Sequence, residues 1–229
     1  MIKCIFLDLD DTLLDFQGGE RRSIIRAFRD MGLPTDEAII RRYIEINLDC
    51  WHALERGEMT KDQVLVDRFQ ILFSEMGISA SAERAQEIYE AYLCTEHDFL
   101  PEAQKLLDGL SERGYRLFMA TNGIPTVQKP RIADSGVAKY FEQIFISEEI
   151  GYAKPQIEFF YACFDRIESF DVSEAMIVGD SLSSDIKGGI NSGMLTCHYN
   201  PKDKPYDHIK PDYKIKTLSE LLTLLDGMK

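Results

Sequence analysis

Hydrophobic and polar positions follow two different patterns along the chain. Residues 2–7 are mostly apolar and predict a buried strand. After residue 99, further β-type runs are separated by helical stretches, and they lie at 116–121, 143–147, 175–179 and 194–198. Strands that alternate with helices are typical of a parallel sheet covered on both faces. We therefore expect the α/β class, with a Rossmann-like parallel sheet.

The stretch between these parts predicts helices only. Its apolar residues recur at helical spacing in four segments, at 20–32, 36–57, 61–77 and 82–97. Thr60 and Gln63 form a capping-box pattern at the start of the third segment. We expect a helical bundle, residues 16–98, inserted into an α/β core made of residues 1–15 and 99–229.

Composition narrows the possible partners. The 229 residues carry a net charge of −13, from 39 acidic and 26 basic side chains. A nucleic-acid polymer is not expected as a partner, because its binders carry a basic footprint. The chain enters a strand pattern directly, and its apolar runs fall short of the roughly 20 residues of a membrane span. We expect a cytoplasmic monomer or homodimer with no membrane partner, and five reduced cysteines.

Reactive side chains follow the predicted strands at their carboxyl ends, where parallel sheets bind ligands. Asp8 and Asp10 come after the first strand, and alternation would put both on one face if the strand continued that far. Two carboxylates held together are costly unless a cation separates them or one is protonated. The other candidates are Thr121, Asn122, Lys154, Asp180 and Asp185.

This set contains what phosphoryl transfer through an aspartyl-phosphate requires. A carboxylate can act as nucleophile, and a second acid can protonate the leaving group and then activate water. Carboxylate oxygens suit Mg²⁺, while a hydroxyl and an ammonium group can hold phosphate oxygens. Each feature alone has a simpler explanation as a turn, a helix cap or a solvated loop residue. Their order, spacing and position at strand ends favour the catalytic interpretation.

Together these residues resemble the haloacid dehalogenase (HAD) superfamily of phosphohydrolases across the whole core. Residues 8–13, Asp-Leu-Asp-Asp-Thr-Leu, resemble its first motif, DxDxT. Thr121 after an apolar strand resembles the second, and Lys154 in Ala-Lys-Pro the third. Residues 179–185, which begin Gly-Asp and end in Asp, resemble the fourth motif, GDxxxxD.

The resemblance implies a role for each catalytic position. Asp8 would be the nucleophile and Asp10 the general acid and base. Thr121 and Lys154 would hold the transferring phosphoryl group, together with the backbone of Asn122.

The resemblance also implies a Mg²⁺ site. Asp8 and Asp180 would supply carboxylate ligands, and Asp10 would contribute through its backbone carbonyl. Asp185 would bind the ion through water or anchor the ligands.

The inserted bundle resembles the C1 cap of this superfamily, which closes over the site and selects the leaving group. A small phosphorylated metabolite is therefore expected as substrate. Three features look most like the nucleoside 5′-monophosphatase branch: residues 13–16 followed at once by a long helix, residues 121–123, and residues 151–155. A nucleoside 5′-monophosphate is therefore the expected substrate. Phe16, where the chain enters the bundle, could stack a base.

Pro125 and Pro130 lie in the helix-forming stretch after Thr121 and could shorten or displace its first turn.

Other activities remain open on these residues. The motifs fit a sugar phosphomutase or another small-metabolite phosphatase, such as a phosphoglycolate-type enzyme. A 2-haloacid dehalogenase is disfavoured by the acid at Asp10, since family dehalogenases lack one there and need no Mg²⁺. A non-catalytic protein on this fold is disfavoured because every motif position keeps its reactive residue.

Overall fold

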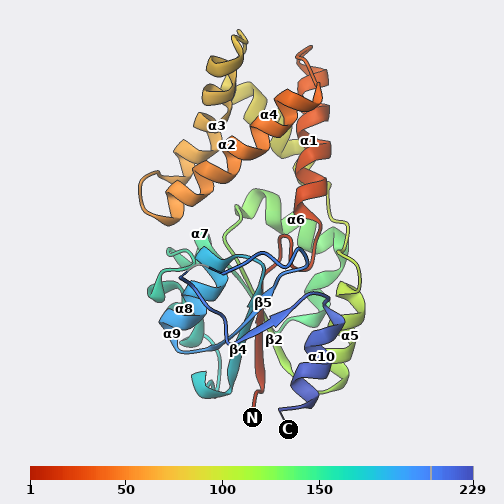
Figure 1. The fold of residues 1–229 in the computed structure, drawn as a ribbon, viewed down its shortest axis with the longest axis vertical. Coiled ribbons are helices and arrows are strands. Elements are labelled where there is room, and N and C mark those ends of the chain that lie inside the picture. Colours follow the sequence, from red (N-terminus) through yellow and green to blue (C-terminus); the bar gives the residue numbers. More distant parts are fainter. Residues whose placement is uncertain (207, 229) are drawn as a thin grey trace. The chain divides into compact units, whose positions relative to one another are not determined.

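The computed structural model describes residues 1–206 and 208–228. The chain forms two compact units (Figure 1). One consists of Met1–Asp15 with His97–Lys229, and we call it the core unit. The other is Phe16–Glu96, which we call the helical unit.

The core unit is built on a six-stranded parallel sheet, which confirms the predicted α/β class. Its strand order is β3-β2-β1-β4-β5-β6. The strands are β1 (Cys4–Leu7), β2 (Arg116–Thr121), β3 (Gln143–Ile146), β4 (Ala175–Gly179), β5 (Leu195–Tyr199) and β6 (Tyr213–Ile215). Because β1 pairs with β2 on one side and β4 on the other, the carboxyl ends of three motif-bearing strands are neighbours. The order also reverses here, where open α/β sheets bind their ligands.

Helices cover both faces of this sheet (Figure 1). They are α5 (Ala103–Glu112), α6 (Pro125–Ser135), α7 (Ser147–Ile150), α8 (Ile157–Phe164), α9 (Lys187–Ser192) and α10 (Ser219–Asp226), with short turns at Val137–Tyr140, Val172–Glu174 and Leu182–Ile186. Ile5 and Leu7 of β1 pack in the cluster that includes residues of α5 and α10. Cys4 and Phe6 pack in the opposite cluster with residues of α8. Burial on both faces explains why β1 is a continuous apolar run.

Helix α6 keeps its first turn despite its two prolines. Pro125 occupies the first helical position, where a missing N–H costs no hydrogen bond, and the helix continues through Pro130 to Ser135. The expected shortening is therefore wrong, and α6 reaches far enough to place Gln128 and Arg131 one turn apart.

The helical unit contains α1 (Phe16–Asp30), α2 (Glu37–Glu55), α3 (Lys61–Met76) and α4 (Ala82–Leu93). The predicted capping box of Thr60 and Gln63 is present at the start of α3. Among the described residues, no helix has the length and apolar character needed to cross a membrane.

A buried arginine organises the interior of the helical unit. Arg68 donates to Asn47 Oδ1 and to Gln86 Oε1, both at 2.6 Å. Its guanidinium carbon lies 4.9 Å from the ring centroid of Tyr89. Asn47 in turn donates to the buried Glu20 carboxylate at 2.6 Å. Burying a charge is costly unless it is hydrogen-bonded and compensated. The two amide acceptors and the Glu20 carboxylate, linked through Asn47, reduce this cost, although Arg68 Nε has no hydrogen-bond partner.

Candidate active site

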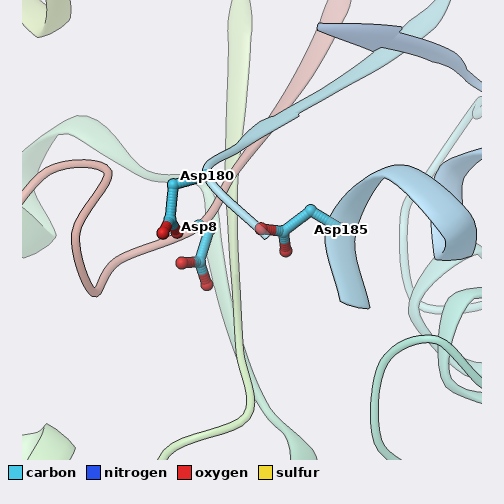
Figure 2. Close-up of side chains that lie close together, drawn as sticks. All are labelled: Asp8, Asp180 and Asp185. Atoms are coloured by element: carbon cyan, nitrogen blue, oxygen red, sulfur yellow. The ribbon is translucent and has the colours of Figure 1, made fainter. Parts of the chain in front are cut away.

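Three carboxylates meet at the carboxyl ends of β1 and β4 (Figure 2). Asp8, Asp180 and Asp185 offer ligand oxygens that all lie within 4.8 Å of one another. Asp8 directly follows β1, and its backbone N–H donates to Val178 O of β4 at 3.0 Å. Asp180 directly follows β4, and Asp185 lies in the π-helical turn Leu182–Ile186. Sheet pairing and one tight turn therefore bring the three groups together.

Gly179 makes room for the Asp185 carboxylate. A Cβ atom at this position would lie 2.1 Å from Asp185 Oδ2 and 2.3 Å from its Cγ. The same carboxylate accepts a hydrogen bond from Ser181 N at 3.1 Å, and Asp185 is fully buried. Only a residue without a side chain lets the turn fold back so closely on the strand end.

Lys154 is the internal counter-charge of this cluster. Its Nζ donates to Asp8 Oδ1, Asp185 Oδ1 and Ala120 O, each at 2.6 Å. The three bonds use all three ammonium protons, and the side chain is 2% exposed. The predicted solvated-loop alternative for Lys154 is thus wrong.

One ammonium group does not balance the negative charge gathered here. Burial raises the pKa of Asp8 to about 8 in spite of Lys154, and Asp185 and Asp10 push it in the same direction. Burial, together with Asp8 and Asp185, also raises the pKa of Asp180 well above its usual range. Burial opposes the charged form of Lys154, but Asp185 and Asp8 outweigh it and raise the pKa of the amine. The site therefore has an affinity for additional positive charge.

The donor set fits a Mg²⁺ ion. Oxygens bound to one octahedral Mg²⁺ lie about 2.9 to 4.2 Å apart. The ligand oxygens of this cluster all lie within 4.8 Å of one another, which is compatible with such a site. A divalent cation would offset the burial and the carboxylate repulsion that raise the pKa values of Asp8 and Asp180. The group of ligand carboxylates includes Asp8, Asp180 and Asp185 but not Asp10.

Strand alternation does not extend to Asp8 and Asp10, because β1 ends at Leu7. The chain turns instead, with Asp11 at φ 56° and Asp11 N donating to Leu14 O at 2.8 Å. While Asp8 contacts Lys154, the Asp10 carboxylate accepts hydrogen bonds from residues of α6. The condition under which strand alternation would put both side chains on one face is therefore not met.

Thr121, Asn122 and Phe16, the other predicted site residues, lie outside the carboxylate cluster. Thr121 ends β2, and its buried Oγ1 accepts hydrogen bonds from Gln128 Nε2 at 2.9 Å and Gly123 N at 3.2 Å. The Asn122 side chain holds the Lys154 backbone, donating to its carbonyl at 2.8 Å and accepting from its N–H at 2.9 Å. Phe16 is the partly buried first residue of α1 in the helical unit.

Sequence reasoning assigned no role to several residues that orient the site. Thr12 Oγ1 accepts from Asp180 N at 3.1 Å and so fixes the start of the fourth motif. His198 Nε2 donates to Asp180 O at 2.8 Å, and burial lowers the pKa of its imidazole. Gln128 and Arg131 hold Asp10. In the sequence, the i, i+3 spacing of Gln128 and Arg131 indicates only that both lie on one face of a helix. It does not show which loop this face contacts.

Comparison with known proteins places this geometry in a family. The family described as haloacid dehalogenase-like hydrolase matches residues 2–193. YfnB of Bacillus subtilis (strain 168) is 37% identical over 98% of this chain and 95% of its own length. A crystal structure of YfnB bound to magnesium has a TM-score of 0.94 and covers 98% of this chain and 99% of its own.

Two further relatives are named as pyrimidine 5′-nucleotidases. PynA of Streptococcus pneumoniae (strain ATCC BAA-255 / R6) is 35% identical, over 98% of this chain and 95% of its own. YjjG of Escherichia coli (strain K12) is 30% identical, over 96% of each chain. The chain therefore belongs to the haloacid dehalogenase-like hydrolase family, as its four motifs predicted.

Proposed function

We propose that this protein is a Mg²⁺-dependent phosphomonoesterase that hydrolyses a nucleoside 5′-monophosphate through an aspartyl-phosphate on Asp8. The carboxylate cluster of Asp8, Asp180 and Asp185, with Lys154 between two of its members, carries the proposal. A bound Mg²⁺ would supply positive charge beside the phosphate oxygens, held by Asp8, Asp180 and the buried Asp185.

In the first half-reaction, one carboxylate oxygen of Asp8 forms a bond to phosphorus as the bond from phosphorus to the ester oxygen breaks. Asp10 gives its proton to that leaving oxygen, which departs as the alcohol. The positive charge of Lys154, whose protons bind Asp8, Asp185 and Ala120, offsets the charge that develops on the transferring group, and the Thr121 hydroxyl donates to it. The phosphoryl group then rests on Asp8, and Asp10 is ionised.

In the second half-reaction, Asp10 takes a proton from a water molecule, whose oxygen bonds to phosphorus. The bond from phosphorus to Asp8 breaks, which releases inorganic phosphate and restores both carboxyl groups to their starting states. The net reaction consumes one ester and one water and yields one alcohol and one phosphate.

The nucleotide assignment draws support from the relatives PynA and YjjG, both named as pyrimidine 5′-nucleotidases. We further propose that the helical unit is the substrate-selecting cap and that Phe16 stacks on the base. Phe16→Leu keeps an apolar side chain but removes the ring, so KM for a nucleotide should rise by about threefold to tenfold. KM for an aryl phosphate without a base should stay within twofold. An equal rise for both substrates would contradict the stacking role.

The mechanism is tested with Asp8→Asn, assayed by phosphate release with Mg²⁺ present. Replacing the nucleophile should reduce turnover by at least about 10³-fold, while thermal unfolding shows that the protein is still folded. The matched control is Asp165→Asn, because Asp165 is exposed at the end of α8. Full activity in Asp8→Asn would rule out the aspartyl-phosphate.

The substrate class is tested by comparing kcat/KM for nucleoside 5′-monophosphates and sugar phosphates. A preference for nucleotides of at least about tenfold is expected. Preferred hydrolysis of sugar phosphates would favour another metabolite phosphatase. Isomerised sugar phosphate without free phosphate would indicate a mutase instead.

A further inference from the structure

Helix α6 presents two buried side chains to the Asp10 carboxylate. Arg131 NH1 donates to Asp10 Oδ1 at 2.6 Å, and Gln128 Nε2 donates to Asp10 Oδ2 at 2.7 Å. Each carboxylate oxygen thus has its own donor. Arg131 is fully buried and Gln128 is 1% exposed, whereas the Asp10 side chain is 24% exposed. The carboxylate is therefore held from the protein side and open on the other.

The two donors are also bound to each other and to the second motif. Arg131 NH1 donates to Gln128 Oε1 at 2.7 Å, which fixes the orientation of the amide. With its oxygen used in this way, the Gln128 NH₂ group points to Asp10 and, at 2.9 Å, to Thr121 Oγ1. One amide thereby sets the position of an acid–base carboxylate relative to a phosphate-holding hydroxyl.

Gly123 makes this arrangement sterically possible. A Cβ atom on Gly123 would lie 2.2 Å from Gln128 Nε2 and 2.5 Å from its Cδ. Any other residue at 123 would push the amide out of place. The turn after β2 and the face of α6 are thus shaped for each other.

We propose that Gln128 and Arg131 are positioning residues that aim Asp10 at the leaving group. This inference rests on the proposed function. A side chain about 1 Å out of place can cost about 10²-fold in rate, and general acid catalysis contributes about 10²-fold to 10⁴-fold. Loss of either donor should therefore harm the step in which Asp10 protonates the leaving oxygen more than it harms binding.

The test compares kcat/KM for two phosphate esters in Gln128→Met and Arg131→Met. An alkyl ester needs its leaving oxygen protonated, whereas an aryl ester with a stable phenolate hardly does. For each variant, kcat/KM should fall by about 10²-fold with the alkyl ester and by less than about tenfold with the aryl ester. Arg131→Lys should recover part of the alkyl-ester loss, because NH1 alone makes both bonds to Asp10 and Gln128.

Gly123→Ala provides a second route that leaves all three side chains in place. Its methyl group should displace the Gln128 amide and produce the same selective loss. Combining Gly123→Ala with Gln128→Met should lower kcat/KM little further, because both changes remove the same contact between the Gln128 amide and Asp10. Lys129→Met is the control on the same helix, since Lys129 is exposed and pairs with Glu149. Its activity should match that of the unchanged protein.

The outcomes separate this inference from the proposed function. Equal losses on both esters, or no loss, in Gln128→Met and Gly123→Ala would overturn the positioning role, even if Arg131→Met fails to fold. An unchanged protein that hydrolyses neither ester with Mg²⁺ would instead overturn the proposed function. If Asp8→Asn is inactive while the α6 variants keep full activity, only the inference about α6 fails.

Discussion

Replacing Gly179 by alanine should damage the carboxylate cluster without changing any of its members. The new methyl carbon would lie 2.1 Å from Asp185 Oδ2 and 2.7 Å from Asp185 Cβ. Ordinary carbon–oxygen contacts begin near 3.4 Å, so the carboxylate must move by about 1.3 Å. The turn must shift as well, because the Asp185 Cβ cannot rotate away from its own backbone.

The magnitude follows from what this movement breaks. Overpacking a buried site costs about 1–3 kcal/mol. Stretching the 2.6 Å bond between Lys154 and Asp185 adds part of the 3–5 kcal/mol that removing one partner of a buried ion pair costs. A total near 3 kcal/mol is expected, which corresponds to a fall in Tm of about 6–12 °C for a chain of this size.

Calorimetry with and without Mg²⁺ measures both consequences. Tm should fall in the metal-free protein, and the rise in Tm on adding Mg²⁺ should shrink because Asp185 no longer supports the site. Gly227→Ala is the matched control, since its Cβ would meet nothing closer than 3.5 Å and its φ is −77°. If Gly179→Ala unfolds within 1 °C of the unchanged protein and binds Mg²⁺ equally well, the steric argument is wrong.

Two further predictions concern protons and thiols. Burial raises the pKa of Asp8 from 3.8 to about 8, so the folded metal-free protein holds a proton more tightly than the unfolded chain. It should therefore lose stability progressively as the pH rises from about 4 to about 8. Because Mg²⁺ must displace that proton, the rise in Tm on adding Mg²⁺ should be larger at about pH 8.5 than at about pH 6. Equal rises at the two pH values would contradict the raised pKa of Asp8. Burial raises the pKa of Cys163 and Cys197 to about 12, so a thiol reagent should modify the partly exposed Cys94 first in the native protein. Mass spectrometry gives the order, and early modification of Cys163 would refute it.

Local sequence patterns correctly predicted the strands and the parallel sheet. The apolar run before Asp8 predicted a buried strand because both faces of β1 are covered. The alternation of strands and helices predicted a parallel sheet, and such a sheet brings its carboxyl ends to one edge. This is why Asp8, Asp180 and Lys154 could be grouped although they lie far apart in the chain.

Local patterns gave no prediction of how two distant segments are placed against each other. Alternation would put Asp10 on the face of Asp8 only if the strand continued, but β1 ends at Leu7 and the Asp10 carboxylate contacts α6. The hydrogen bonds between the Asn122 side chain and the Lys154 backbone were not predicted either. Neither contact leaves a periodic trace in the sequence.

The sequence by itself therefore determined the fold class and the family and supplied the candidate site residues, because periodicity and motif spacing are local properties of the chain. Only the tertiary structure decided how the acids differ. Asp8 joins Lys154 and the cluster of Asp180 and Asp185, whereas Asp10 is held by Gln128 and Arg131. Those partners lie more than a hundred residues away, and hydrogen bonds shorter than 3 Å depend on packing that no local pattern encodes.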